Sequence, residues 1–415
     1  MGKNSQRNSE SLSRSCPIVT RFSSEALTSK QILIRIAFAW LVWRIFLQLL
    51  VLLAPVMLSY QPSFPYSATL VNSGLSKEFF SWANFDGVHY LTIARDGYFA
   101  ADLIQAFFPI YPLLIRFFSS SLNPILVGVI ISNLSLLGSL YFGFLLTRKL
   151  FTQQAAKHSV FLLLTFPTSF YLGSVYNESL FLMLVLAGCW YYATNKKAIS
   201  GFLMGLSSGV RLVGLMLIPA IISRWISKFK KNGSSLKNHI YETIIENKSF
   251  IVGLFLGLTV FGGFIYFLWQ NYSDPLYFFS VQSRFGAGRQ TNLILLPQTF
   301  YRSARILLTA RPFDWKYFSY VQDFFISTLF ILGIIFSWKK LKIEYSIFSL
   351  LVYLLPTLTG NLSSMPRYMI VIFPMFMWWA QLISEKPKWQ IVYYPITIIL
   401  LLINTVLFVQ GYWVA

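Results

Sequence analysis

The sequence is poor in acidic residues, histidine and cysteine. Only 14 of its 415 residues are Asp or Glu, against 34 Lys and Arg, and it holds three histidines and two cysteines. The histidines (His89, His158 and His239) are too scattered to chelate together, and Cys16 and Cys189 suggest neither a disulfide framework nor a metal site. No HExxH, Walker, dinucleotide-binding or Ser-His-Asp pattern is present. These absences argue against a zinc or nucleotide-using enzyme, and we expect no metal and no cofactor.

Apolar residues dominate the chain instead. Hydrophobic residues make up 56% of it and charged residues 12%, more apolar surface than a soluble core can use. Continuous apolar runs long enough to cross a bilayer fall at 31–58, 123–147, 158–174, 180–194, 250–269, 318–338, 343–359, 368–384 and 389–412. With two short helices broken around Ser207–Arg211, the sequence predicts an all-α polytopic membrane protein of about eleven transmembrane or re-entrant helices.

Lysine and arginine gather at the ends of these runs and set the predicted topology. The basic segments are the tail 1–30, Arg148-Lys149, Lys196-Lys197, the run 228–237, Lys339 to Lys342 and Lys386 to Lys388. The positive-inside rule places them in the cytoplasm, so the net charge of +20 reflects topology rather than nucleic-acid binding. A single domain, 31–415, then follows the cytoplasmic tail, and the loops 59–122, 270–317 and 359–367 are expected outside.

The first of these loops contains the most informative segment, FDGVHYLTIARDGY at residues 85–98. Its spacing predicts a short interfacial helix that closes at Asp96-Gly97, with Asp86 in the first turn and His89 on the same face. An ionisable residue at a membrane boundary is costly to keep, which makes Asp86 a candidate catalytic residue. The alternative is that Asp86 only caps the helix.

Several other polar residues are expected on the same side as Asp86. The second loop carries Arg284 and Arg289, and a basic cluster on the face that should be poor in Lys and Arg indicates an anionic partner, either a substrate phosphate or lipid headgroups. Arg211 lies in the helix break and needs a carboxylate or a ligand phosphate as its partner. Arg367 begins a helix, where the dipole disfavours a cation, and Glu178 begins another, as a cap or facing the site.

The segment 85–98 and the string FFPIYP at 107–112 resemble motifs of the PIG-V family, membrane mannosyltransferases of the glycosylphosphatidylinositol pathway and their prokaryotic relatives. Phe85 stands where the family usually has Trp. The element Tyr176–Ser179 resembles the family's Y-x-E-S, and residues 274–282 resemble a later loop. The brevity of the chain and its charge pattern are typical of a prokaryotic relative, for which the plasma membrane is the expected location.

The resemblance implies a GT-C-type bundle that transfers a sugar, mannose by default, from a polyprenyl-phosphate donor on the non-cytoplasmic side. The acceptor is a lipid-, glycan- or protein-linked hydroxyl, and the reaction inverts the anomeric carbon without a metal. Asp86 is then the catalytic base, because an inverting transfer needs one carboxylate to accept the acceptor's proton. The candidates for donor-phosphate binding are Arg211, Arg284, Arg289 and Arg367, and those for substrate positioning are His89, Tyr90, Tyr111, Glu178 and Gln282. The alternative function is a transporter or flippase of a lipid-linked anionic sugar.

Overall fold

The computed structural model describes residues 27–232, 236–285, 290, 292–312 and 314–414. Within these ranges the chain forms nineteen α-helices, five short 3-10 helices and no strand. Six helical segments are long and apolar enough to cross a membrane. The predicted all-α polytopic membrane fold is therefore confirmed, while nearly all of the predicted tail 1–30 lies outside the described residues.

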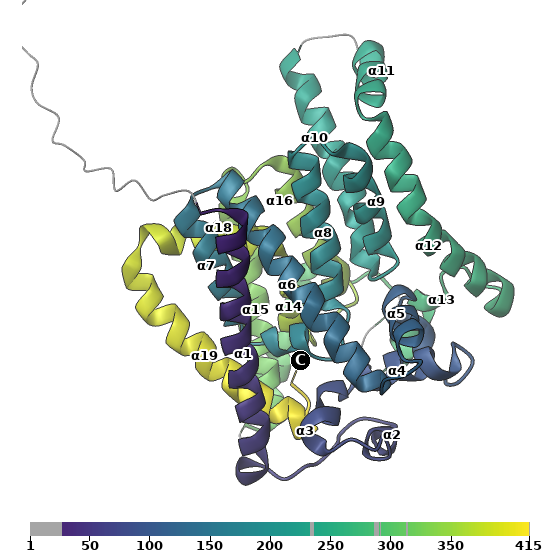
Figure 1. The fold of residues 1–415 in the computed structure, drawn as a ribbon, viewed down its shortest axis with the longest axis vertical. Helices are drawn as coiled ribbons and strands as arrows, with labels where there is room; N and C mark the ends of the chain where they lie inside the picture. The colour runs from purple at the N-terminus through teal and green to yellow at the C-terminus, as the bar shows by residue number, and fades with distance from the viewer. Residues whose placement is uncertain (1–26, 233–235, 286–289, 291, 313, 415) are drawn as a thin grey trace, which may run out of the picture.

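Figure 1 shows a bundle of helices and further helices, several of which lie at one end of the bundle. The bundle consists of α1 (Ser29–Met57), α6 (Pro124–Leu150), α7 (Gln153–Leu164), α8 (Glu178–Ala193), α9 (Lys197–Ser208), α10 (Leu217–Asn232), α12 (Lys248–Tyr272), α15 (Trp315–Ser337), α16 (Ile343–Thr357), α18 (Phe373–Glu385) and α19 (Pro387–Val409). The further helices are α2 (Ser67–Val71), α3 (Lys77–Phe80), α4 (Asp86–Asp96), α5 (Ile110–Phe118), α11 (Leu236–Glu246), α13 (Tyr277–Ser280), α14 (Leu296–Thr309) and α17 (Met365–Met369). Helices α2 to α5 and α13 lie at the end of the bundle away from α11.

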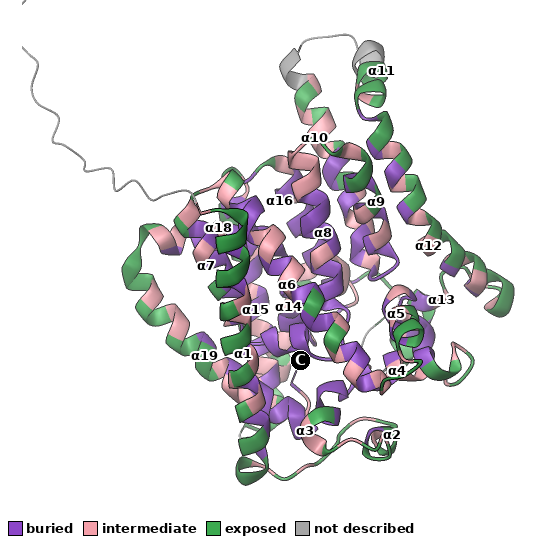
Figure 2. Ribbon diagram, in the orientation of Figure 1, coloured by how far each residue is buried: buried purple, intermediate pink, exposed green. Residues whose placement is uncertain are grey.

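Burial divides the bundle into a core and a lipid-facing shell. Most residues of α8 are buried, and Figure 2 shows it in the middle of the molecule. Helices α1, α12 and α19 carry large exposed apolar side chains, such as Val56, Phe255 and Ile391, which are 87%, 67% and 76% exposed. In a multi-pass membrane protein such surfaces face the acyl chains, which solvate them as well as a protein core would.

Two predicted helix boundaries are wrong, and proline accounts for both. The segment 158–174 was expected to be one crossing, yet α7 ends at Leu164 and a 3-10 helix follows at Ser169–Gly173. Pro167 disfavours a helical conformation in the residue before it. The segment 368–384 begins its long helix only at Phe373, where Pro374 occupies the first turn and the short α17 precedes it.

The predicted break near Ser207–Arg211 is confirmed. Helix α9 ends at Ser208, Arg211 has an extended backbone (φ −151°, ψ 141°), and a 3-10 helix at Leu212–Met216 leads into α10. The side-chain amide of Asn177 donates to the Val210 carbonyl at 2.8 Å, so one carbonyl freed by the break is satisfied inside the protein. The break thereby presents Arg211 to the beginning of α8.

Helices α9 and α12 cross with their backbones in direct contact. Each carries a G-x-x-x-G pair, Gly201/Gly205 and Gly253/Gly257, and these glycines face the backbone of the opposite helix. A β-carbon added at Gly257 would clash with the Phe202 carbonyl oxygen and lie 2.6 Å from the Leu206 nitrogen. Small residues permit such close packing, which drives helix association where lipid removes the hydrophobic advantage.

Gly257→Ala is therefore expected to destabilise the protein by about 1–3 kcal/mol, because rigid backbone atoms must move to admit a single methyl group. Thermal unfolding in detergent micelles measures this. Gly262→Ala, on the same helix, is the matched control, because a β-carbon added there meets no atom within 4 Å. Equal melting temperatures for the two variants would contradict the tight crossing.

Candidate active site

Helix α4 presents the predicted carboxylate as its first residue. The helix runs from Asp86 to Asp96 and stops at Gly97, whose φ of +83° ends it, as the sequence predicts. The N-cap position is held by Phe85, not by Asp86, so the interpretation of Asp86 as a simple N-cap is wrong. Phe85 has φ 59° and ψ −120°, a conformation that a residue with a β-carbon rarely adopts.

Asp86 is the outermost member of an ionic network built from four separate segments. Arg367 of α17 donates from Nη1 to Asp86 Oδ2 at 2.5 Å and from Nε to Glu178 Oε1 at 2.7 Å. Arg211, from the break after α9, donates from Nη1 to the same Glu178 oxygen at 2.5 Å and to Asn177 Oδ1 at 2.8 Å. The chain thus joins α4, α8, α17 and the helix break through charged groups.

Burial increases inward along this network. The side chain of Asp86 is 29% exposed, those of Arg367 and Arg211 are each 10% exposed, and that of Glu178 is fully buried. Two carboxylates and two guanidiniums balance in charge, and their mutual attraction offsets the desolvation cost of burying each group. Asp86 is the member that faces outward, and a molecule arriving from that side meets it first.

Tyrosine rings and hydroxyls fix the position of the Asp86–Arg367 pair. The guanidinium of Arg367 lies 4.6 Å from the ring centre of Tyr176 and 5.3 Å from that of Tyr171. The Tyr176 hydroxyl accepts from the Asp86 backbone N–H at 3.2 Å and donates to the Asn84 carbonyl at 2.9 Å. The start of α4 is therefore tied to the residues that precede α8.

The structure decides between the alternatives that the sequence left for Glu178 and Arg211. Asn177 holds the N-cap position of α8, so the helix-cap interpretation of Glu178 is wrong. Glu178 instead receives both guanidiniums through Oε1, and its Oε2 is buried without a hydrogen-bond partner. The partner of Arg211 is this carboxylate.

The remaining predicted residues of the first loop lie around Asp86. His89 stacks on Phe107, with 5.0 Å between ring centres, and burial lowers the pKa of the imidazole against the opposing charge of Asp86. Tyr90 is buried with its ring edge against Phe107 and Tyr111. The Tyr111 hydroxyl bonds to the Gly128 carbonyl at 3.0 Å and to Ser132, which anchors the FFPIYP segment on α6.

Of the predicted residues of the second loop, the structure describes Arg284 and Gln282. Arg284 pairs at the surface with Asp102, 3.7 Å away, and both side chains are more than half exposed. Gln282 is partly buried in the 3-10 helix Val281–Phe285. Arg289 falls outside the described residues. Of the three described arginines among the candidates for donor-phosphate binding, Arg367 and Arg211 belong to the Asp86 network and Arg284 pairs with Asp102 instead.

Two participants escaped the sequence reasoning. Tyr171 lies against Arg367, and Asn84 receives the Tyr176 hydroxyl bond. Asn84 could have been recognised from its position directly before the Phe85 motif. A polar side chain in so apolar a chain costs free energy unless it has a hydrogen-bond partner. Asn84 is indeed fully buried.

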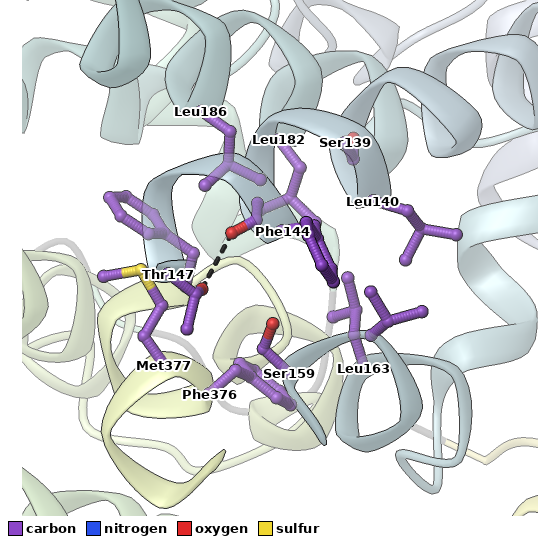
Figure 3. Close-up of a pocket in the computed structure, with 13 residues that line it drawn as sticks. Ser139, Leu140, Phe144, Thr147, Ser159, Leu163, Leu182, Leu186, Phe376 and Met377 are labelled. Carbon is purple, nitrogen blue, oxygen red and sulfur yellow. Dashed lines mark hydrogen bonds between the residues drawn. The ribbon is translucent and has the colours of Figure 1, made fainter. Parts of the chain in front are cut away.

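A small cavity elsewhere in the bundle is not the substrate site. A cavity of about 30 Å³ lies between α6, α7, α8 and α18, with room for about one water molecule. Figure 3 shows its mostly apolar lining, with Thr147 bonded to a neighbouring backbone carbonyl and Ser139 and Ser159 as the other polar side chains. None of the network's ionic residues lines it, so it is a packing defect of the bundle.

Among the described residues, no group of three or more His, Cys, Asp or Glu side chains converges as a metal site would require. A family model described as Mannosyltransferase (PIG-V) matches residues 30–331, which include Asp86, Glu178 and Arg211 and leave Arg367 beyond the matched segment. No curated protein and no solved structure matches the chain.

Proposed function

Because this chain belongs to the mannosyltransferase (PIG-V) family and is a membrane glycosyltransferase, we propose that it transfers mannose from a polyprenyl-phosphate donor to a hydroxyl group. The acceptor hydroxyl is carried by a lipid, a glycan or a protein. The observation that carries the proposal is the Asp86–Arg367 pair at the outward end of a buried ionic network. Arg367 Nη1 lies 2.5 Å from Asp86 Oδ2 there, so a carboxylate and a cation are held together.

Asp86 is proposed to act as the general base of an inverting displacement. The acceptor oxygen attacks the anomeric carbon of mannose while its proton passes to Asp86, and the bond from that carbon to the phosphate oxygen breaks. One carboxylate suffices for this step because no covalent intermediate forms. The partial exposure of Asp86 and its ion pair with Arg367 both support this role.

Arg367 is proposed to bind the donor phosphate and to stabilise the charge that develops as the phosphate leaves. Guanidinium groups bind phosphate through paired, charge-assisted hydrogen bonds. Arg367 lies next to Asp86, while Arg211 lies behind Glu178, so we assign the phosphate to Arg367 and a supporting role to Arg211. A preorganised cation in this position can supply the electrostatic stabilisation that a metal ion supplies elsewhere.

We further infer that the site faces the non-cytoplasmic side. The support is the distribution of charge, because the lysine-rich turns belong to the end of the bundle where α9, α10 and α11 meet. There Lys197 and Lys228 both pair with Glu246, and α4, whose first residue is Asp86, lies toward the opposite end (Figure 1). The positive-inside rule assigns the lysine-rich end to the cytoplasm.

A donor-swap assay tests the function. The purified protein is placed in vesicles made from the lipid extract of its own cells, so that native lipid acceptors are present. Labelled mannosyl-phosphopolyprenol is expected to transfer label in the presence of EDTA, and the product glycoside is expected to show the anomeric configuration opposite to the donor. Labelled GDP-mannose is expected to give no transfer, because the site offers one phosphate-binding arginine beside Asp86 and no nucleotide-binding motif.

Transfer from GDP-mannose alone would overturn the donor assignment. Transfer that requires an added divalent cation would overturn the metal-independent mechanism, and retention of configuration would overturn the role of a single carboxylate. Movement of the intact mannosyl lipid across the bilayer without transfer would instead support a flippase.

A further inference from the structure

We propose that the segment Phe408–Trp413 is a positioning element for Asp86, acting through Asn84 and Phe85. This inference rests on the proposed function, since it concerns how the base is held. The segment lies beyond the residues that the family model matches and far from Asp86 in sequence, yet it packs directly against the turn that precedes α4.

The first contact is between backbone and side chain. The side-chain amide of Asn84 donates from Nδ2 to the Phe408 carbonyl at 2.8 Å, and Nδ2 also lies 3.4 Å from the Val409 carbonyl. These two carbonyls are the last of α19. The Phe408 carbonyl also accepts the Gly411 backbone N–H at 3.0 Å, so Asn84 adds to the bonds that close this end of the helix. Asn84 is fully buried, so this bond fixes the residue whose own carbonyl receives the Tyr176 hydroxyl.

The second contact encloses the strained residue. Phe85 holds a backbone conformation with positive φ, which persists only where the surroundings impose it. Its ring lies 5.7 Å from that of Trp413 at 82° and 5.9 Å from that of Phe408, with Phe64 on a third side at 4.7 Å. Asp86 follows this residue directly, so a relaxed Phe85 would rotate the start of α4.

The segment is itself locked in place. Gln61 and Ser63 donate their backbone N–H groups to the carbonyls of Gln410 and Gly411 at 2.8 and 2.9 Å. Gly411 has φ +83°, and a β-carbon there would lie 2.7 Å from Pro62 Cα, so only glycine fits. The Ser319 hydroxyl of α15 donates to the Trp413 carbonyl at 3.1 Å. The backbone that carries Trp413 is therefore held from two directions.

The consequence is specific to catalysis. Trp413 carries no charged group and meets Phe85 through its ring, so its loss should not remove a group that binds the donor phosphate. It should let Phe85 leave its strained conformation and move the carboxylate away from the acceptor hydroxyl. A displacement of about 1 Å at a reacting group can cost about 10²-fold in rate.

The test is the kinetics of Trp413→Ala with mannosyl-phosphopolyprenol as donor. We expect kcat to fall about 10²-fold while the KM for the donor stays within about twofold, and we expect Trp413→Phe to recover most of the activity. Trp389→Ala is the matched control, an exposed tryptophan at the other end of α19. Phe85→Leu is expected to lower kcat similarly, and the double variant Phe85→Leu/Trp413→Ala no further, because both act through one residue.

A normal kcat for Trp413→Ala, or additive losses in the double variant, would overturn the proposal. If Trp413→Ala does not fold, Phe85→Leu carries the test, and a normal kcat in Phe85→Leu would overturn the proposal as well. Asp86→Asn separates the two levels of inference. Full activity in Asp86→Asn refutes the proposed base itself, whereas an inactive Asp86→Asn beside a normal Trp413→Ala refutes only the positioning role.

Discussion

Asp86→Asn is expected to abolish mannosyl transfer while the protein stays folded and still binds its donor. Asparagine keeps the size of the side chain and an oxygen that can accept from Arg367, so the contact seen at 2.5 Å survives without its charge. The amide cannot take a proton from the acceptor hydroxyl, and a general base contributes about 10²–10⁴-fold to the rate. Initial rates with labelled mannosyl-phosphopolyprenol measure the loss.

The matched control for this prediction lies on the same helix. Asp96 ends α4, is 40% exposed and pairs with Arg95, so it shares the secondary structure of Asp86 but not its network. Asp96→Asn should keep the rate of the unmodified protein, since an exposed pair of this kind contributes little to stability. Near-normal transfer by Asp86→Asn would show that the carboxylate is not the base.

Local patterns in the sequence predict local structure here, and the reason is physical. Helix α4 and its end at Gly97 follow from spacing and from glycine's freedom at positive φ, both of which act within a few residues. The break before Arg211 is visible for the same reason, as a run of small and polar residues between two apolar stretches. These features place Asp86 and Arg211 at helix ends without a structure.

The network itself depends on distances that the sequence does not contain. Glu178 lies 33 residues from Arg211 and 189 from Arg367, and nothing in any one segment says that the three meet. Arg284 looked equally suitable by residue type and loop position, yet it binds Asp102 at the surface. The charge of a residue indicates whether it could belong to the network. Which of these residues do belong to it depends on how the helices pack.

The role of residues 408–413 was missed for a related reason. Phe408, Val409 and Trp413 carry no ionisable group, and their contacts with the turn before Asp86 run through backbone carbonyls and aromatic rings. Every residue except proline offers the same backbone groups, so sequence gives no sign of which carbonyl meets which donor.

Glu178→Gln is expected to destabilise the protein by about 3–5 kcal/mol, because it leaves two buried guanidiniums to share the single charge of Asp86. The wild-type network balances two carboxylates against two arginines, and Glu178 is its fully buried centre. Glutamine fits the space but carries no charge, so the loss comes from electrostatics rather than from a cavity. Denaturant or thermal unfolding in lipid nanodiscs measures it.

A second substitution separates charge balance from simple damage. Arg211→Met alone should also destabilise, since it leaves an excess carboxylate, but Glu178→Gln/Arg211→Met restores neutrality and should be more stable than either single variant. Glu246→Gln is the surface control, because Glu246 also lies near two cations, Lys197 and Lys228, while its side chain is 57% exposed. Its loss should cost less than about 1 kcal/mol. A double variant less stable than both singles would mean that shape, not charge, holds the site together.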